Sequence, residues 1–90
     1  MEYEWDQEKA AANYRKHHVH FADAVGVFED EHALTEVDAT GNEERTRTLG
    51  VDFLGRILRV VWTMRGDNMI RLISARTATT AERKIYEGTA

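Results

Sequence analysis

The sequence predicts an α+β domain in the order ααββββα, with two N-terminal helices, a four-stranded antiparallel sheet and a C-terminal helix. Residues 7–28 repeat apolar side chains at helical spacing, residues 33–76 alternate with a period of two, and residues 79–88 return to a helical pattern. Short turns between the alternating segments favour antiparallel neighbours, with the helices packed on one face of the sheet. At 90 residues, the chain is expected to form one domain over residues 1–90.

The N-terminal segment predicts the two helices. Residues 2–5 alternate and can form a short edge strand. Asp6 then caps a helix over residues 7–17, in which Ala10, Tyr14 and His17 recur at helical spacing as the buried stripe. A second, shorter helix is expected over residues 22–28.

The alternating segments predict strands over residues 33–38, 46–53, 57–64 and 69–76. Turns are expected at residues 39–42, at Gly55 and at residues 65–68, the last a clear hairpin turn. Trp62 shares a strand face with apolar neighbours, which assigns its ring to the core rather than to base stacking. Thr79-x-x-Glu82 matches a capping box and opens the final helix, which Gly88 ends.

The charges divide the chain into two unlike parts. Residues 1–44 hold three Lys and Arg against twelve Asp and Glu, whereas residues 45–90 hold nine against four. This asymmetry suggests one face for a polyanion and another for a different partner. The chain has no cysteine, which excludes disulfides, thiolate catalysis and cysteine-based zinc sites. Without an apolar signal segment or a run of ~20 apolar residues, a cytoplasmic protein that does not contact membranes is expected.

The last strand and the final helix together predict an anion site. The two-residue period places Ile70, Leu72, Ser74 and Arg76 on one face, and Arg71, Ile73 and Ala75 on the other. Arg76 then ends the strand next to the helix N-terminus, and a guanidinium at such a place favours anions. The alternative is that Arg76 merely pairs with Glu82 or another carboxylate.

Clustered arginines and a Lys-His pair extend this interpretation. Clustering on successive elements is typical of nucleic-acid binders, and it involves Arg56, Arg59, Arg65, Arg71 and Arg76. His17 suits acid–base chemistry near neutral pH, and Lys16 can hold a phosphate as a point charge. The three histidines within residues 17–20 lack a zinc-binding spacing, so neither a metal nor a cofactor is expected.

Two motifs dominate the chain. The first is Trp5-Asp6-x-x-Lys9-Ala10-x-x-Asn13-x-x-Lys16-His17-x-Val19-x-Phe21, and the second is Arg71-x-Ile73-Ser74-Ala75-Arg76-x-Ala78-Thr79-x-x-Glu82-Arg83-x-x-Tyr86. With Leu49-Gly50 and Arg65-Gly66-Asp67 between them, they resemble the BrnT family of small bacterial toxins. The resemblance runs from Trp5 to Tyr86.

The resemblance implies a RelE-like fold and the toxin of a type II toxin–antitoxin pair. The implied activity is that of a metal-independent endoribonuclease that cleaves RNA and inhibits translation and growth. The implied partner is a BrnA-like antitoxin with a ribbon-helix-helix domain, in a complex of two toxins and two antitoxins that contacts DNA only through the antitoxin. The resemblance carries Lys16, His17, Ser74 and Arg76 over as active-site groups, and Arg65 beside them.

Metal-free RNA cleavage by the 2′-hydroxyl requires a clamp on the charged phosphate and groups that move protons. Arg76, with Arg71 or Arg65, would supply the clamp, and Arg59 belongs to the same phosphate-binding set. His17 would act as general acid or base, with Glu82 as a possible base. The alternative function is a catalytically inactive toxin fold that binds the antitoxin as a corepressor, which the acidic half and a pI near 5.5 favour.

Overall fold

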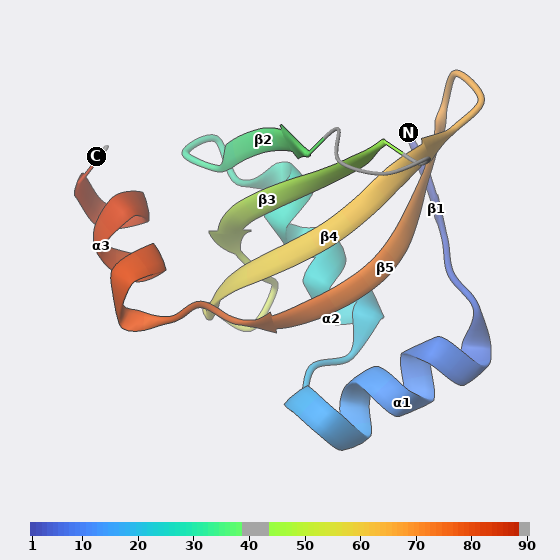
Figure 1. The fold of residues 1–90 in the computed structure, drawn as a ribbon, viewed down its shortest axis with the longest axis horizontal. Coiled ribbons are helices and arrows are strands. Elements are labelled where there is room, and N and C mark those ends of the chain that lie inside the picture. Colours follow the sequence, from blue (N-terminus) through green and yellow to red (C-terminus); the bar gives the residue numbers. More distant parts are fainter. Residues whose placement is uncertain (39–43, 89–90) are drawn as a thin grey trace.

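The computed structural model describes residues 1–38 and 44–88 and confirms the α+β class (Figure 1). The predicted turn at residues 39–42 lies outside the described residues. The elements in chain order are β1 (Glu2–Glu4), α1 (Gln7–His17), α2 (Phe21–Ala24), the 3-10 helix η1 (Val25–Glu29), β2 (Leu34–Asp38), β3 (Arg45–Val51), β4 (Ile57–Arg65), β5 (Met69–Thr77) and α3 (Thr80–Gly88).

The sheet has five strands in the order β1-β5-β4-β3-β2, with β1 parallel to β5 and the other pairs antiparallel. The prediction of a four-stranded antiparallel sheet was therefore wrong. The short N-terminal segment completes the sheet because Glu2, Tyr3 and Glu4 pair with residues 69–71 at the start of β5. Tyr3 and Trp5 also pack against the core, which anchors this strand.

The core lies between the sheet and the segment formed by α2 and η1. This segment contributes Phe21, Ala24 and Val27, preceded by Val19, all at most 2% exposed. The strands contribute Leu58, Val60, Ile70, Leu72 and Ala75. Trp62 packs against the same cluster, as predicted, and its Nε1 donates to the Thr48 hydroxyl at 2.9 Å.

Helix α1 packs along β5 through a polar contact of Asn13, while Ala10 of the predicted stripe packs against the core. Its Asp6 cap is confirmed, since Oδ1 accepts from the amides of Glu8 and Lys9 at 2.8 and 3.0 Å. Tyr14 was wrongly assigned to the buried stripe: it is 41% exposed, and its ring stacks on His20 with the centroids 3.9 Å apart. The buried position on this helix belongs to Asn13, at 7% exposure.

Strand β5 contains a β-bulge that changes which residues face the core. Val61 pairs with Ser74, but the next residue, Trp62, pairs with Leu72, so that Ile73 is the extra residue. A bulge of this kind shifts the alternation by one position. The predicted grouping of Ser74 and Arg76 with Ile70 and Leu72 was therefore wrong: Ala75 joins the core, while Ser74 and Arg76 lie on the opposite face with Arg71.

Helix α3 lies on the opposite face of the sheet from α2, so the expectation that all helices pack on one face was wrong. Its Glu82 and Ile85 line a pocket of about 460 Å³ together with residues from β2, β3 and β4 that point away from the core. Figure 1 shows α3 at the end of the sheet where β5 finishes. No residue of α3 is buried. Among the described residues, no helix is long and apolar enough to span a membrane.

Candidate active site

The face of the sheet opposite α2, called here the open face, is rich in arginine. Strand alternation with the bulge places six arginines on it: Arg45, Arg47, Arg59, Arg65, Arg71 and Arg76. The structure therefore brings the predicted phosphate-binding residues Arg59, Arg65 and Arg71 onto one surface with Arg76. Arg45 and Arg47 were not singled out from the sequence, although their alternation with buried Thr46 and Thr48 points them to this face.

Arg56 does not belong to this face. Its Nε and Nη2 donate to Asp52 Oδ2 at 2.9 and 2.7 Å, and its Nη1 donates to the carbonyl of His18 at 3.2 Å. Asp52 is buried and also accepts from the amides of Leu54 and Arg56. Arg56 thus holds the β3–β4 turn in place, and its guanidinium does not belong to the cluster of arginines on the open face.

Arg76 and Glu82 form the centre of the candidate site. The two guanidinium nitrogens Nη1 and Nη2 donate to the two carboxylate oxygens at 2.7 and 3.0 Å, a bidentate pair. Arg59 approaches the same carboxylate, with Nε 3.7 Å from Oε2. The ion pair between Arg76 and Glu82, which the sequence offered as an alternative to anion binding, is therefore present in the site. Glu82 lies between two arginines of neighbouring strands.

The capping box of α3 fixes this carboxylate. The Thr79 amide donates to Glu82 Oε1 at 2.8 Å, and the Glu82 amide donates to the Thr79 hydroxyl at 3.2 Å. Chiefly through the hydrogen bonds from Arg76, and further through those from Thr79, the pKa of Glu82 falls to about 2. Glu82 is therefore ionised throughout the neutral range, and the pKa of Arg76 is raised in return, chiefly by its hydrogen bond to Glu82.

His17 lies at the end of α1, close enough to Arg76 to respond to its charge. Burial lowers the pKa of His17 below its ordinary 6.5, and the positive charges of Lys16 and Arg76 lower it further. The imidazole is therefore mostly neutral at pH 7. Lys16 is exposed, whereas His17 and Ser74 are half-buried. The structure thus brings His17 to the part of β5 that carries Ser74 and Arg76.

Asn13 positions α1 against β5, a role that the sequence analysis missed. Its Oδ1 accepts from the Ala75 amide at 3.0 Å, and its Nδ2 donates to the carbonyls of Ala75 at 2.8 Å and Val19 at 3.1 Å. Strand β1 pairs only with residues 69–71, so the Asn13 amide pairs with the strand edge farther along, between Ser74 and Arg76. The signal was available in the spacing, because Asn13 lies three residues from Ala10 and four from His17.

Asp30 is a second missed residue, and it holds the far end of α3. Its Oδ2 accepts from the Tyr86 hydroxyl and, at 2.9 Å, from the Val51 amide, while Oδ1 accepts from the His32 amide at 2.9 Å. The hydrogen bond to Asp30 is the main cause that raises the pKa of Tyr86 to about 12. Helix α3 is therefore held at both ends by polar contacts, through Glu82 and through Tyr86.

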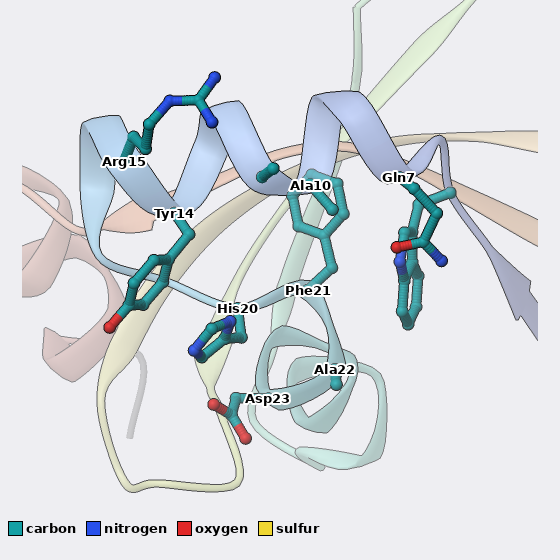
Figure 2. A pocket seen from close by; sticks show the side chains of 10 residues that line it. Gln7, Ala10, Tyr14, Arg15, His20, Phe21, Ala22 and Asp23 are labelled. Carbon is teal, nitrogen blue, oxygen red and sulfur yellow. The ribbon is translucent and has the colours of Figure 1, made fainter.

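The nearby histidines do not converge on a metal site. His18 is the left-handed C-cap of α1, with φ of 58°, and His20 stacks on Tyr14. Within residues 1–38 and 44–88, no group of three or more His, Asp or Glu side chains is arranged to hold a metal ion. His20 and Tyr14 instead line a pocket of about 680 Å³ between α1 and α2, to which Phe21 and Asp23 also contribute (Figure 2).

Comparisons with known proteins agree with the sequence motifs. The sequence model of the BrnT family, described as the ribonuclease toxin BrnT of type II toxin–antitoxin systems, matches residues 5–82. Among solved structures, the crystal structure of the Brucella abortus ribonuclease toxin BrnT is similar, with a TM-score of 0.67 and 26% sequence identity over 89% of this chain and 99% of that chain. The comparison with curated proteins gave no match. Because the family model covers most of its length, this chain belongs to the BrnT family of ribonuclease toxins of type II toxin–antitoxin systems.

Proposed function

We propose that this protein is a metal-independent endoribonuclease of the RelE-like kind. It cleaves RNA through attack of a 2′-hydroxyl on the adjacent phosphate, and in doing so inhibits translation and growth. The observation that carries the proposal is the position of Arg76. Its guanidinium lies on an arginine-rich sheet face, oriented by Glu82 and within electrostatic range of the neutral His17.

Arg76 and Arg59 would stabilise the charge that develops on the phosphate. Preorganised cationic donors are usually the largest contribution to catalysis of this kind, because they need not reorganise as the charge forms. Glu82 is assigned to hold them rather than to act as the base. A carboxylate with a pKa of about 2 is too weakly basic to remove a proton from a hydroxyl efficiently.

His17 is the proposed proton-transfer group. A lowered pKa leaves its imidazole unprotonated at neutral pH, which suits a general base that accepts the 2′-hydroxyl proton. Ser74, on the same face as Arg76, would donate a hydrogen bond to a phosphate oxygen. Lys16 would attract the flanking phosphate, since its side chain is exposed next to His17.

The family implies an antitoxin partner for this chain. We propose that the partner is a BrnA-like antitoxin with a ribbon-helix-helix domain, in a complex of two toxins and two antitoxins in the cytoplasm, and that the complex contacts DNA only through the antitoxin. The acidic charge of residues 1–44 complements a basic antitoxin segment.

The test is RNA cleavage by purified protein freed of antitoxin, in EDTA. Wild type is expected to cleave, Arg76→Ala to lose cleavage and growth inhibition, and Arg76→Lys to lose most of the rate because it cannot form the bidentate pair. Arg83→Ala is the matched control, since Arg83 is exposed on α3 and pairs only loosely with Glu87 at 3.7 Å. Cleavage that requires an added metal, or a fully active Arg76→Ala, would contradict the proposal.

A second candidate function is the inactive corepressor, and one observation favours it. Glu82 already neutralises Arg76 and contacts Arg59, as in a structural ion pair. A folded protein that binds its antitoxin tightly, yet cleaves neither free RNA nor RNA on the ribosome, would support this function instead.

A further inference from the structure

A second cationic pocket lies on the open face, near the β4–β5 hairpin and away from Glu82. It has a volume of about 150 Å³ and is lined by Lys9, Arg45, Thr63, Arg65, Arg71 and Ile73. Its four cations come from four different elements: α1, β3, β4 and β5. The fold therefore assembles positive charge here from segments that are far apart in the sequence.

These cations have few carboxylate partners. Arg71 contacts Glu4, with Nη1 3.3 Å from Oε2. The pKa of Asp6 is lowered chiefly by the hydrogen bond from the Lys9 amide, and less by the charges of Lys9 and Arg71. Lys9 and Arg65 form no ion pair with any side chain that the structure describes, and the pocket lining contains no acidic residue. Bringing like charges together costs free energy that a bound anion offsets.

We propose that this pocket binds a phosphate group of the RNA substrate, upstream or downstream of the phosphate that is cleaved at Arg76. The inference rests on the proposed ribonuclease function and adds Lys9 and Arg45 to its binding surface. Arginine side chains match phosphate oxygens with paired N–H donors, and the Thr63 hydroxyl adds a further donor. The pocket is large enough for one phosphate group, and its cationic lining favours an anion over an uncharged base.

The spacing along β5 defines the length of RNA that reaches both sites. Arg71 and Arg76 are five positions apart and the bulge lies between them, which corresponds to about 15 Å of strand. One strand of double-stranded DNA advances about 3.4 Å per nucleotide, and with this rise as a guide for stacked RNA the two phosphates would be about four nucleotides apart. An RNA of three nucleotides would therefore fill only one of the two sites.

An acidic protein segment is the competing occupant, and the geometry favours RNA. The pocket and the Arg76 site share one continuous sheet face, so that a single strand of regularly spaced phosphates can contact both. Arg47 lies between them on β3, and its Nε is buried without a hydrogen-bond partner among the described residues. A phosphate backbone crossing this face would pass Arg47 between the two sites, in competition with Glu36, whose Oε2 lies 3.6 Å from Arg47 Nη2.

The experiment measures binding of uncleavable 2′-O-methyl oligonucleotides of three and ten nucleotides by fluorescence anisotropy at several salt concentrations. The variant is Lys9→Gln with Arg45→Gln, two exposed side chains that line the pocket. The control is Arg83→Gln with Lys84→Gln, which removes two exposed cations from α3. For the ten-nucleotide RNA, the variant should bind more weakly, and its salt slope should fall by about 0.7 for each lost phosphate contact.

Binding of the three-nucleotide RNA should weaken far less in the variant than binding of the ten-nucleotide RNA, because the short RNA can still occupy the Arg76 site alone. The inference is overturned if the variant keeps the wild-type salt slope for ten nucleotides, if both lengths weaken equally, or if wild type binds neither. It is also overturned if the variant loses only its affinity for the antitoxin. If the protein binds RNA as expected but does not cleave unmodified RNA, the proposed ribonuclease function is contradicted, whereas the phosphate site is still supported.

Discussion

Asn13 is the residue whose contacts most directly connect the fold to the site. Its side chain pairs with both backbone groups of Ala75, between Ser74 and Arg76. Asn13→Leu would leave these groups and the Val19 carbonyl buried without partners, at a cost of about 3 kcal/mol in the free energy of unfolding. Urea denaturation measures this loss. Gln7→Leu, on the exposed side of the same helix, is the control, and equal midpoints for the two variants would contradict the role assigned to Asn13.

His17 determines a second prediction at the scale of single residues. Because its pKa is lowered, chiefly by burial, the cleavage rate should rise with pH through a midpoint below 6.5 and then level off. His17→Gln should remove this rising limb. The lowered pKa also means that folding favours the neutral imidazole of His17. The contribution of His17 to the free energy of unfolding is therefore complete above pH 6.5 and is lost as the pH falls. An NMR titration of His17 with a midpoint at or above 6.5 would contradict this account.

Helix α3 depends on polar contacts rather than on burial, and this gives a prediction at the scale of the element. The pKa of Glu82 is lowered to about 2 from 4.5, so its pairing with Arg76 stabilises the fold above pH 4.5, and this contribution is lost as the pH falls towards 2. The difference in free energy of unfolding between wild type and Glu82→Gln should therefore be largest near neutral pH and shrink below 4.5. Glu87→Gln, in an exposed pair, should show almost no difference at any pH.

The secondary-structure elements were largely predictable from local pattern, whereas their faces were not. The N-cap at Asp6, the capping box at Thr79 and the alternation in β3 and β4 depend on neighbouring residues, and the structure confirms them. The bulge at Ile73 and the pairing of β1 with β5 depend on contacts between distant segments, which periodicity does not contain. For the same reason Arg76 was recognised at the strand end, while Asn13, Asp30 and Arg45 were not.

At the scale of the whole molecule, the charge of the open face differs in sign from the net charge of the protein. The protein has a formal charge of −4 at pH 7, yet six arginines share one sheet face. Part of the opposing negative charge lies elsewhere, since Asp23 and Glu29 belong to α2 and η1, the segment on the other face of the sheet (Figure 1). RNA affinity should therefore follow the local surface rather than the isoelectric point.

The difference between the charge of the open face and the net charge leads to a quantitative prediction. Four phosphate contacts to single-stranded RNA give a salt slope near −2.8, so affinity should fall about 50-fold between 50 and 200 mM salt. Because the slope counts the phosphates that are neutralised, Glu29→Gln with Glu31→Gln should leave it unchanged, although two exposed negative charges are removed. Anisotropy titrations of the ten-nucleotide RNA measure both quantities. A slope that changed with these two charges would mean that overall charge, and not the arginine face, governs RNA binding.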